Sequence, residues 1–232
     1  MAKLRGYEVE VYEKRPDFRE TDTYEGRSIN LALSERGLSA LDKVGLKEKV
    51  REGGLPMRSR LIHSLSGHLD EQPYDEVGGK CIYSIGRRFI NEVLVNEGEK
   101  AGVRFLWNHK VESYSLRTGH ISFLQLHQEK PKEVKDADLV VASDGAFSAL
   151  RQCISGNPFF RHELNQHYIE HGYKELAILP KDGKHRIRND VLHIWPRGEF
   201  MMIALPNLDG SFTVTLFMPF RGKRGSFFLL NF

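Results

Sequence analysis

The chain has 232 residues, of which 40% are hydrophobic and 28% are charged; this composition is that of a globular protein and excludes an intrinsically disordered one. Its 34 basic and 31 acidic residues leave a formal net charge of +3, which gives no reason to expect a nucleic acid or a membrane surface as partner. No secretory signal and no run of roughly 18 apolar residues is present, so we expect a soluble chain without a membrane span.

Potential metal and disulfide ligands are few. The two cysteines, Cys81 and Cys153, lie far apart without a partner at metal-ligand spacing, so we expect free thiols in a reducing compartment, with a structural disulfide as the alternative. The histidines His63, His171 and His193 fit no zinc-binding spacing. The sequence predicts no metal site.

The N-terminal part predicts short elements separated by turns. Residues 2–5 are typical of the last turn of a helix that Gly6 ends, and the alternating residues 7–12 predict a strand that places Glu13 at its end. Residues 14–33 are rich in charge and turn formers, which predicts a loop. A helix is expected from Ser34 to about Gly53.

The middle of the chain predicts mixed helix and strand. A helix that Gly102 ends is expected to carry Ile90, Val93 and Leu94 on one face, and the stretch before Gly79 is turn-prone. The apolar run DLVVA (138–142) is typical of a buried parallel strand. Further strands are predicted at 58–64, 81–85, 103–107, 110–115 and 120–127.

The last third predicts almost only strands. Between about residues 165 and 219, apolar residues alternate over 191–195, 200–205 and 212–218. The pattern therefore changes near residue 155 from mixed α/β to sheet-rich, and we place a domain boundary there.

Glu13 is the first candidate for a binding role. An acidic residue that ends a strand of a βαβ unit can accept hydrogen bonds from ribose hydroxyls, and the glycine fingerprint of such a site lies about 20 residues earlier, which is before Met1. An ordinary surface glutamate is the alternative.

The segment DLVVASDGAFSALR (138–151) is the second candidate for a binding role. Asp144 and Gly145 form a turn before a helix whose start can bind anions. The alternative is an ordinary strand–turn–helix connection with a capping aspartate.

Several longer stretches show a family resemblance. VYEKR (11–15), GRSINLALSERG (26–37), GLPMRSRLIHSLSG (54–67), HIWPR (193–197) and FMMIALPNLDGSFTVTLFMPF (200–220), together with HGYKEL (171–176), resemble the kynurenine 3-monooxygenase family of flavin-dependent aromatic hydroxylases. The Asp-Gly segment is similar to the motif that touches flavin and reduced nicotinamide in these enzymes. The resemblance covers nearly all of residues 6–220.

The resemblance implies the cofactors FAD and NADPH, and the hydroxylation of L-kynurenine to 3-hydroxykynurenine with O₂ in tryptophan catabolism, towards NAD biosynthesis. FAD carries that chemistry, so no side chain is expected to be catalytic. The implied cofactor-binding residues are Tyr12, Glu13, Lys14, Arg15, Arg27, Ala32, Arg87, Val111, Asp144 and Gly145.

The resemblance also implies a substrate site. Arg60 and Tyr74 match the pair that holds the amino-acid carboxylate of kynurenine, and a guanidinium with a phenol suits a carboxylate; a solvated surface arginine is the alternative for Arg60. Four residues of the sheet-rich region are candidates to line the aromatic site, with plain sheet core as the alternative: Met202, Ile203, Leu205 and Phe217.

The expected fold is α/β: a partial FAD-binding Rossmann-like domain of the glutathione-reductase type (1–155), a sheet-rich substrate-binding region (156–220) and a divergent tail (221–232). We expect the family's glycine-rich turn to precede Met1, and its second Gly-Asp motif and membrane anchor to follow residue 220. The resemblance implies the mitochondrial outer membrane. The alternatives are a soluble cytosolic location and a non-catalytic truncated form that acts at most as an interaction module.

Overall fold

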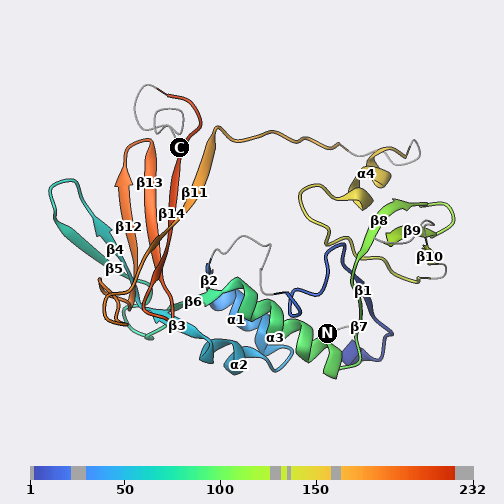
Figure 1. The fold of residues 1–232 in the computed structure, drawn as a ribbon, viewed down its shortest axis with the longest axis horizontal. Helices are drawn as coiled ribbons and strands as arrows, with labels where there is room; N and C mark the ends of the chain where they lie inside the picture. Colours follow the sequence, from blue (N-terminus) through green and yellow to red (C-terminus); the bar gives the residue numbers. More distant parts are fainter. Residues whose placement is uncertain (1–2, 22–29, 126–131, 135–136, 158–162, 223–232) are drawn as a thin grey trace. The chain divides into compact units, whose positions relative to one another are not determined.

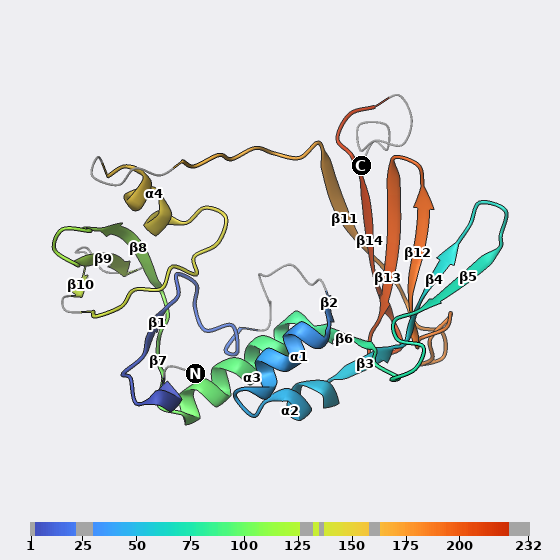
Figure 2. The ribbon, with the colours of Figure 1, turned by 180° about the vertical axis from the view of Figure 1, so that it is seen from behind.

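The computed structural model describes residues 3–21, 30–125, 132–134, 137–157 and 163–222 (Figures 1 and 2). The chain forms two compact units, and each is assembled from separate stretches of sequence. The first contains residues 26–95 and 168–232 with Met1, and the second contains residues 2–25 and 96–167. Of the predicted tail, residues 223–232 lie outside the described part.

The first unit contains two sheets. A three-stranded antiparallel sheet has the order β2-β6-β3, and a six-stranded sheet has the order β11-β14-β13-β12-β4-β5. In the six-stranded sheet only β4 and β12 run parallel. The strands are β2 (Asn30–Leu33), β3 (Gly54–Met57), β4 (Ser59–His63), β5 (Leu69–Pro73), β6 (Ile82–Gly86), β11 (His171–Ile178), β12 (Val191–Arg197), β13 (Phe200–Pro206) and β14 (Phe212–Pro219).

The sheet-rich prediction for the last third of the chain is confirmed. The three predicted strands correspond to β12, β13 and β14, and the antiparallel pairs β12–β13 and β13–β14 have no register shift. Ala204, Phe212 and Val214 form a buried cluster on this sheet, against which Trp195 and Met202 pack. Apolar alternation located these strands because one face of each must be buried.

The predicted helix from Ser34 to Gly53 is two helices, α1 (Glu35–Asp42) and α2 (Lys47–Glu52). The break lies at Gly45, whose φ of 73° is accessible to glycine at little cost. Leu41 and Val50, one on each helix, still reach one shared core cluster. The hydrophobic pattern was therefore correct, and the continuity of the helix was wrong.

The helix α3 (Arg87–Lys100) buries Ile90 and Val93, two of the three residues that the sequence places on one face. These two side chains join Ile85 in the core cluster of the first unit. Leu94, the third, is 42% exposed, whereas Val95 is buried.

Four of the described strands were not predicted from the sequence: β2, β3, β5 and β10 (Lys132–Val134). β2 lies within the predicted loop 14–33, and β5 lies within the turn-prone stretch before Gly79. β5 has the sequence LDEQP, and every one of its residues is exposed. Such a strand carries no hydrophobic alternation, because it lies at the sheet edge and is fixed by its pairing with β4.

The second unit contains a 3-10 turn (Lys3–Arg5), where the N–H of Gly6 donates to the carbonyl of Lys3 at 3.0 Å, which confirms Gly6 as the stop. The strand β1 (Glu10–Tyr12) is parallel to β7 (Arg104–Leu106). The remaining elements are the antiparallel strands β8 (His109–Tyr114), β9 (Ile121–Gln125) and β10 (Lys132–Val134), and the helix α4 (Ala149–Ser155).

The prediction of a buried parallel strand at 138–142 is wrong. The segment forms no strand, and Leu139 and Val141 are 80% and 73% exposed. An apolar run becomes a strand when a neighbouring strand pairs with its backbone groups. None of the described strands pairs with this segment.

Candidate functional site

Arg60 and Tyr74, the predicted carboxylate-binding pair, lie together on the β4–β5 hairpin. Arg60 pairs with Gln72, and the N–H of Tyr74 donates to the carbonyl of Arg58 at 3.0 Å, which continues the same register. Because cross-strand partners share a face, Arg60 and Tyr74 are on one face of the sheet. The guanidinium carbon of Arg60 is 5.1 Å from the centroid of the Tyr74 ring, in a cation–π arrangement.

The carboxylates around this hairpin have other partners. Asp70 accepts a hydrogen bond from Gln72 at 2.9 Å, Asp75 accepts from the N–H groups of residues 77, 78 and 80, and Glu71 pairs with Arg188 at 2.8 Å. Within the described part of the chain, no carboxylate forms an ion pair with Arg60. Its guanidinium therefore remains available for an anionic group.

Burial raises the pKa of the Tyr74 hydroxyl, and the neighbouring Arg60 opposes that rise. Tyr74 is only partly exposed, whereas Arg60 is exposed. The phenol therefore stays protonated near neutral pH, where it can donate a hydrogen bond beside the fixed positive charge.

The four candidate wall residues divide between the two faces of the sheet. Ile203 and Leu205 are two residues apart on β13, and Phe217 pairs with Met201 on the same face. Through the pairs Ile203–Ile194, Ile194–Ile62 and Leu192–Arg60, this face is also the face of Arg60. Met202 lies on the opposite face and packs against the buried cluster of Ala204, Phe212 and Val214.

In the second unit, the structure gathers several predicted adenosine-site residues. Glu13 follows β1, and its carboxylate accepts a hydrogen bond from the N–H of Arg15 at 3.0 Å. The ring of Tyr12 stacks on Phe123 with centroids 4.0 Å apart, and Val111 pairs with Phe123 on the neighbouring strand. Burial and the hydrogen bond to Glu10 raise the pKa of Tyr12. Lys14 and Arg15 are exposed beside them.

Asp144 and Gly145 form a turn before α4. Gly145 has a φ of 81°, and Ser148 caps the helix by accepting from the N–H of Arg151 at 2.9 Å. The hydroxyl of Ser148 also donates to Asp144 at 2.6 Å. Burial raises the pKa of Asp144, but the hydrogen bonds from Ser148 and from backbone amides outweigh this and hold it below its usual value. The carboxylate is thus already engaged in capping.

Ala32 and Arg87 belong to the first unit. Ala32 is exposed on β2 and pairs with Ser84 of β6. Arg87 is the first residue of α3, which directly follows β6. The Nε atom of Arg87 is buried and has no hydrogen-bond partner among the described residues. Arg27 lies outside the described residues.

A histidine pair was not predicted from the sequence. Nε2 of His63 lies 2.9 Å from Nδ1 of His193, and Trp195 stacks beside His63 with ring centroids 4.3 Å apart. Alternation along β4 and β12 assigns each of these residues to a face of the sheet. Only the pairing of these two strands, which are far apart in the sequence, brings the residues together.

Within the described chain, no group of three potential ligands could hold a metal ion. None of its helices is long and apolar enough to cross a membrane.

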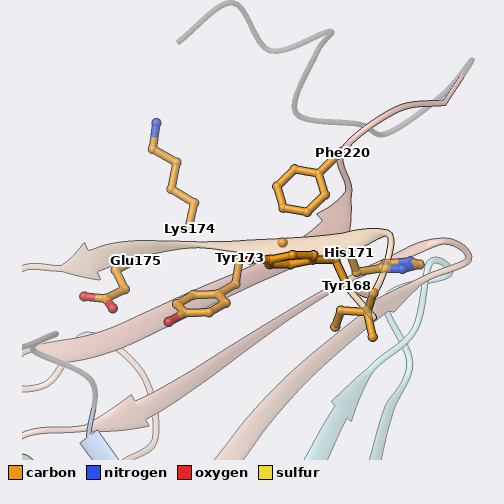
Figure 3. Close-up of a pocket in the computed structure, with 8 residues that line it drawn as sticks. Tyr168, His171, Tyr173, Lys174, Glu175 and Phe220 are labelled. Carbon is orange, nitrogen blue, oxygen red and sulfur yellow. The ribbon is translucent and has the colours of Figure 1, made fainter. Parts of the chain in front are cut away.

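The structure also has a shallow cavity of about 580 Å³ along β11 (Figure 3). The Phe220 ring lies over this strand, and Lys174 and Glu175 point in opposite directions from it. The cavity contains none of the predicted site residues. Its lining residues are Tyr168, Ile169, His171, Gly172, Tyr173, Lys174, Glu175 and Phe220.

Residues 5–171 match the protein family described as "FAD binding domain". The chain belongs to this FAD binding domain family. The matched range contains every predicted cofactor-binding residue, from Tyr12 to Gly145.

Curated proteins similar to this chain include kynurenine 3-monooxygenases. The chain is 47% identical to the Anopheles gambiae protein over 93% of its length and 44% of that protein. It is 43% identical to the Sus scrofa protein over 93% of this chain and 45% of the relative. The bacterial protein of Christiangramia forsetii is 41% identical over 95% of this chain and 48% of its own length. The chain thus spans about half the length of the curated relatives it matches.

Solved structures confirm the α/β fold of the FAD-binding domain. The tetrameric form of 2-methyl-3-hydroxypyridine-5-carboxylic acid oxygenase matches with a TM-score of 0.72 at 20% identity, over 96% of this chain and 55% of that chain. PqsL, a probable FAD-dependent monooxygenase from Pseudomonas aeruginosa, matches with a TM-score of 0.69 at 13% identity, over 94% of this chain and 55% of that one.

Proposed function

We propose that the protein containing this chain is an FAD- and NADPH-dependent monooxygenase that hydroxylates L-kynurenine to 3-hydroxykynurenine with O₂. Relatives named kynurenine 3-monooxygenase, at 41–47% identity, support the reaction. The proposal places the protein in the kynurenine pathway of tryptophan catabolism, towards pyridine nucleotide synthesis, and at the mitochondrial outer membrane that the resemblance implies.

The observation that carries the proposal is the pair formed by Arg60 and Tyr74. The two side chains share a sheet face, their cation–π contact measures 5.1 Å, and no described carboxylate pairs with Arg60. The amino-acid end of kynurenine bears a carboxylate, which a guanidinium and a phenol can bind together. The same sheet face continues through the partly exposed Ile203, which offers apolar surface to an aromatic ring, and the buried Leu205.

The residues of this chain fit FAD at the predicted positions. The buried Nε of Arg87 has no acceptor among the described residues, as expected for an arginine that contacts a polar cofactor. Arg27, Ala32 and Arg87 would contact the flavin, and Glu13 the ribose. Tyr12, Lys14, Arg15 and Val111 would border the adenosine end, and Asp144 with Gly145 would meet flavin and nicotinamide.

FAD, when bound and reduced by NADPH, supplies the oxygenating chemistry. The protein's own contribution is then to orient the substrate. Arg60 and Tyr74 fix the carboxylate end, so the ring lies at a constant distance from that anchor. The apolar sheet face excludes water from the ring. We further propose that residues 1–155 form the FAD-binding part, into which the substrate-binding residues Arg60 and Tyr74 are inserted, and that residues 156–220 form the sheet-rich substrate-binding region.

The test uses the purified protein that contains this chain. We expect a yellow flavin absorption spectrum, NADPH oxidation that kynurenine stimulates, and 3-hydroxykynurenine as the product detected by mass spectrometry. Arg60→Ala should retain the flavin and raise KM for kynurenine, since loss of a charge-assisted contact costs about 2–4 kcal/mol. Flavin binding without any kynurenine-dependent product would refute the substrate. Absence of flavin and of activity would favour a non-catalytic interaction module.

A further inference from the structure

Resting on the proposed function, we propose that Arg188 and Glu71 form a positioning clamp that holds the β4–β5 hairpin, and thereby Arg60 and Tyr74, in place for the substrate carboxylate. The clamp does not itself contact the substrate. It acts on the side of the hairpin opposite the binding pair.

The need for a clamp follows from the position of β5. This strand is at one edge of the six-stranded sheet, and β4 is its only partner among the described strands (Figure 1). All five of its residues are exposed, so no apolar packing fixes it. Tyr74 directly follows this strand, so its position depends on how firmly β5 is held.

Arg188 links β5 to the loop before β12 through Glu71. Its Nη1 and Nη2 atoms donate to the two carboxylate oxygens of Glu71 at 2.8 and 2.9 Å, and its Nε donates to Asp190 at 2.7 Å. The hydroxyl of Ser59, a residue that is only 2% exposed, donates to Glu71 at 2.5 Å. Glu71 is thus held at once by the loop before β12 and by the buried side of β4.

The backbone around Arg188 is fixed as well. Its carbonyl accepts a hydrogen bond from His193, which is 1% exposed, at 2.7 Å. The carbonyl of Asp190 accepts from the N–H of Arg58, two residues before Arg60, at 2.7 Å. The clamp therefore connects the hairpin to the buried part of β12 at several points.

The strand register separates the clamp from the binding pair. Glu71 pairs with Leu61, whereas Arg60 pairs with Gln72, so Glu71 and Arg60 point to opposite faces. Hydrogen bonds from Arg188 and Ser59 lower the pKa of Glu71, so its carboxylate stays charged and bound to Arg188 near neutral pH. Glu71 therefore cannot compete with the substrate for Arg60.

The test measures KM and kcat of the FAD-loaded protein with kynurenine. Glu71→Gln removes the two-point charge pair with Arg188. We expect KM to rise about three- to tenfold with kcat nearly unchanged, since interaction energies between residues of one salt-bridge network are of this size. Arg188→Lys should act in the same direction, because an ammonium cannot bind two carboxylates as a planar fork does. Glu48→Gln, which removes the exposed ion pair with Arg51 on α2, is the matched control and should leave KM unchanged.

A double-mutant cycle separates positioning from general stability. If Glu71 acts through Arg60, then Glu71→Gln should have no further effect on KM in an Arg60→Ala background. An unchanged KM in both Glu71→Gln and Arg188→Lys, or an equal effect with and without Arg60, would overturn the clamp while leaving the proposed function intact. An unchanged KM in Arg60→Ala alone would instead overturn the substrate site, and the clamp with it.

Discussion

Nε2 of His63 lies 2.9 Å from Nδ1 of His193, and Nε2 of His193 lies 2.7 Å from the carbonyl oxygen of Arg188. A carbonyl only accepts, so Nε2 of His193 carries a proton and donates to it. Nδ1 of neutral His193 is then an acceptor, and the proton between the two rings belongs to His63. The strand pairing thus fixes the tautomers of both rings.

This pair predicts a stability that decreases in mild acid. Burial lowers the pKa of both histidines. For His63, the charges of His193 and Arg197 lower the pKa further. For His193, the hydrogen bond to the carbonyl of Arg188 and the carboxylate of Asp190 oppose the lowering, and the charge of Arg188 adds to it. Unfolded histidines bind protons at about pH 6.5, whereas the folded pair does so only at lower pH. Stability is therefore complete above about pH 6.5 and falls as the pH decreases below that value.

Thermal unfolding between about pH 7.5 and about pH 5.5 measures this effect. The Tm of the unaltered protein should fall over this range, and His63→Gln should reduce the fall. The exposed His68 provides the control, since His68→Gln should leave the pH dependence as it was. A Tm profile that is the same in His63→Gln as in the unaltered protein would contradict the assignment.

From the contacts of Tyr74 we expect loss of its hydroxyl and loss of its ring to change the KM for kynurenine by different amounts. Tyr74→Phe keeps the cation–π contact with Arg60 and removes one donor, whereas Tyr74→Ala removes both. We expect the KM for kynurenine to rise in both, and to rise further in the alanine variant by the equivalent of about 0.5–1 kcal/mol. Equal KM values for the two variants would mean that the ring does not orient Arg60.

Ser148 predicts a capping contribution to stability. Its hydroxyl accepts the N–H of Arg151 at the start of α4, so Ser148→Ala should reduce the free energy of unfolding by about 1 kcal/mol. Ser34 occupies the corresponding position before α1 without a side-chain capping bond. Ser34→Ala is therefore a matched control with a smaller expected loss in chemical denaturation, and equal losses would argue against the cap.

Met202 and Ile203 are neighbours in sequence but lie on opposite faces of the sheet. We therefore expect one substitution to affect stability and the other to affect KM. Met202→Ala should lower stability by about 2 kcal/mol, because its side chain packs on the buried cluster, and leave KM unchanged. Ile203→Ala should raise KM for kynurenine, since this residue shares the sheet face of Arg60. A KM increase in Met202→Ala with none in Ile203→Ala would place the substrate on the other face.

The elements that could be predicted from sequence are those with a buried face. β12, β13 and β14 alternate because their side chains enter a core, and α3 carries its apolar residues at helical spacing. β5 could not be found this way, since it is held by pairing and by an ion pair. The run 138–142 shows the converse error, where apolar residues are present but no described strand pairs with them.

For the candidate site, the family resemblance identified individual residues, and the structure showed which of them are in contact. The contact between Arg60 and Tyr74 depends on hairpin register, which a strand without alternation does not reveal. The role of Arg188 depends on the parallel pairing of β4 with β12, which joins segments far apart in the sequence. Such long-range pairings leave no local pattern in either segment.

The parallel pairing of β4 with β12 also has a consequence during protein synthesis. Ser59 pairs with Val191, so at about 5–20 residues per second the hairpin leaves the ribosome on the order of ten seconds before its partner strand. During that interval the unpaired edges of β4 and β5 are open to association with other nascent chains. Charged residues on an edge strand oppose such association, and β5 carries Asp70 and Glu71. The carboxylate that later fixes the hairpin thus protects it from aggregation before Arg188 has been synthesised.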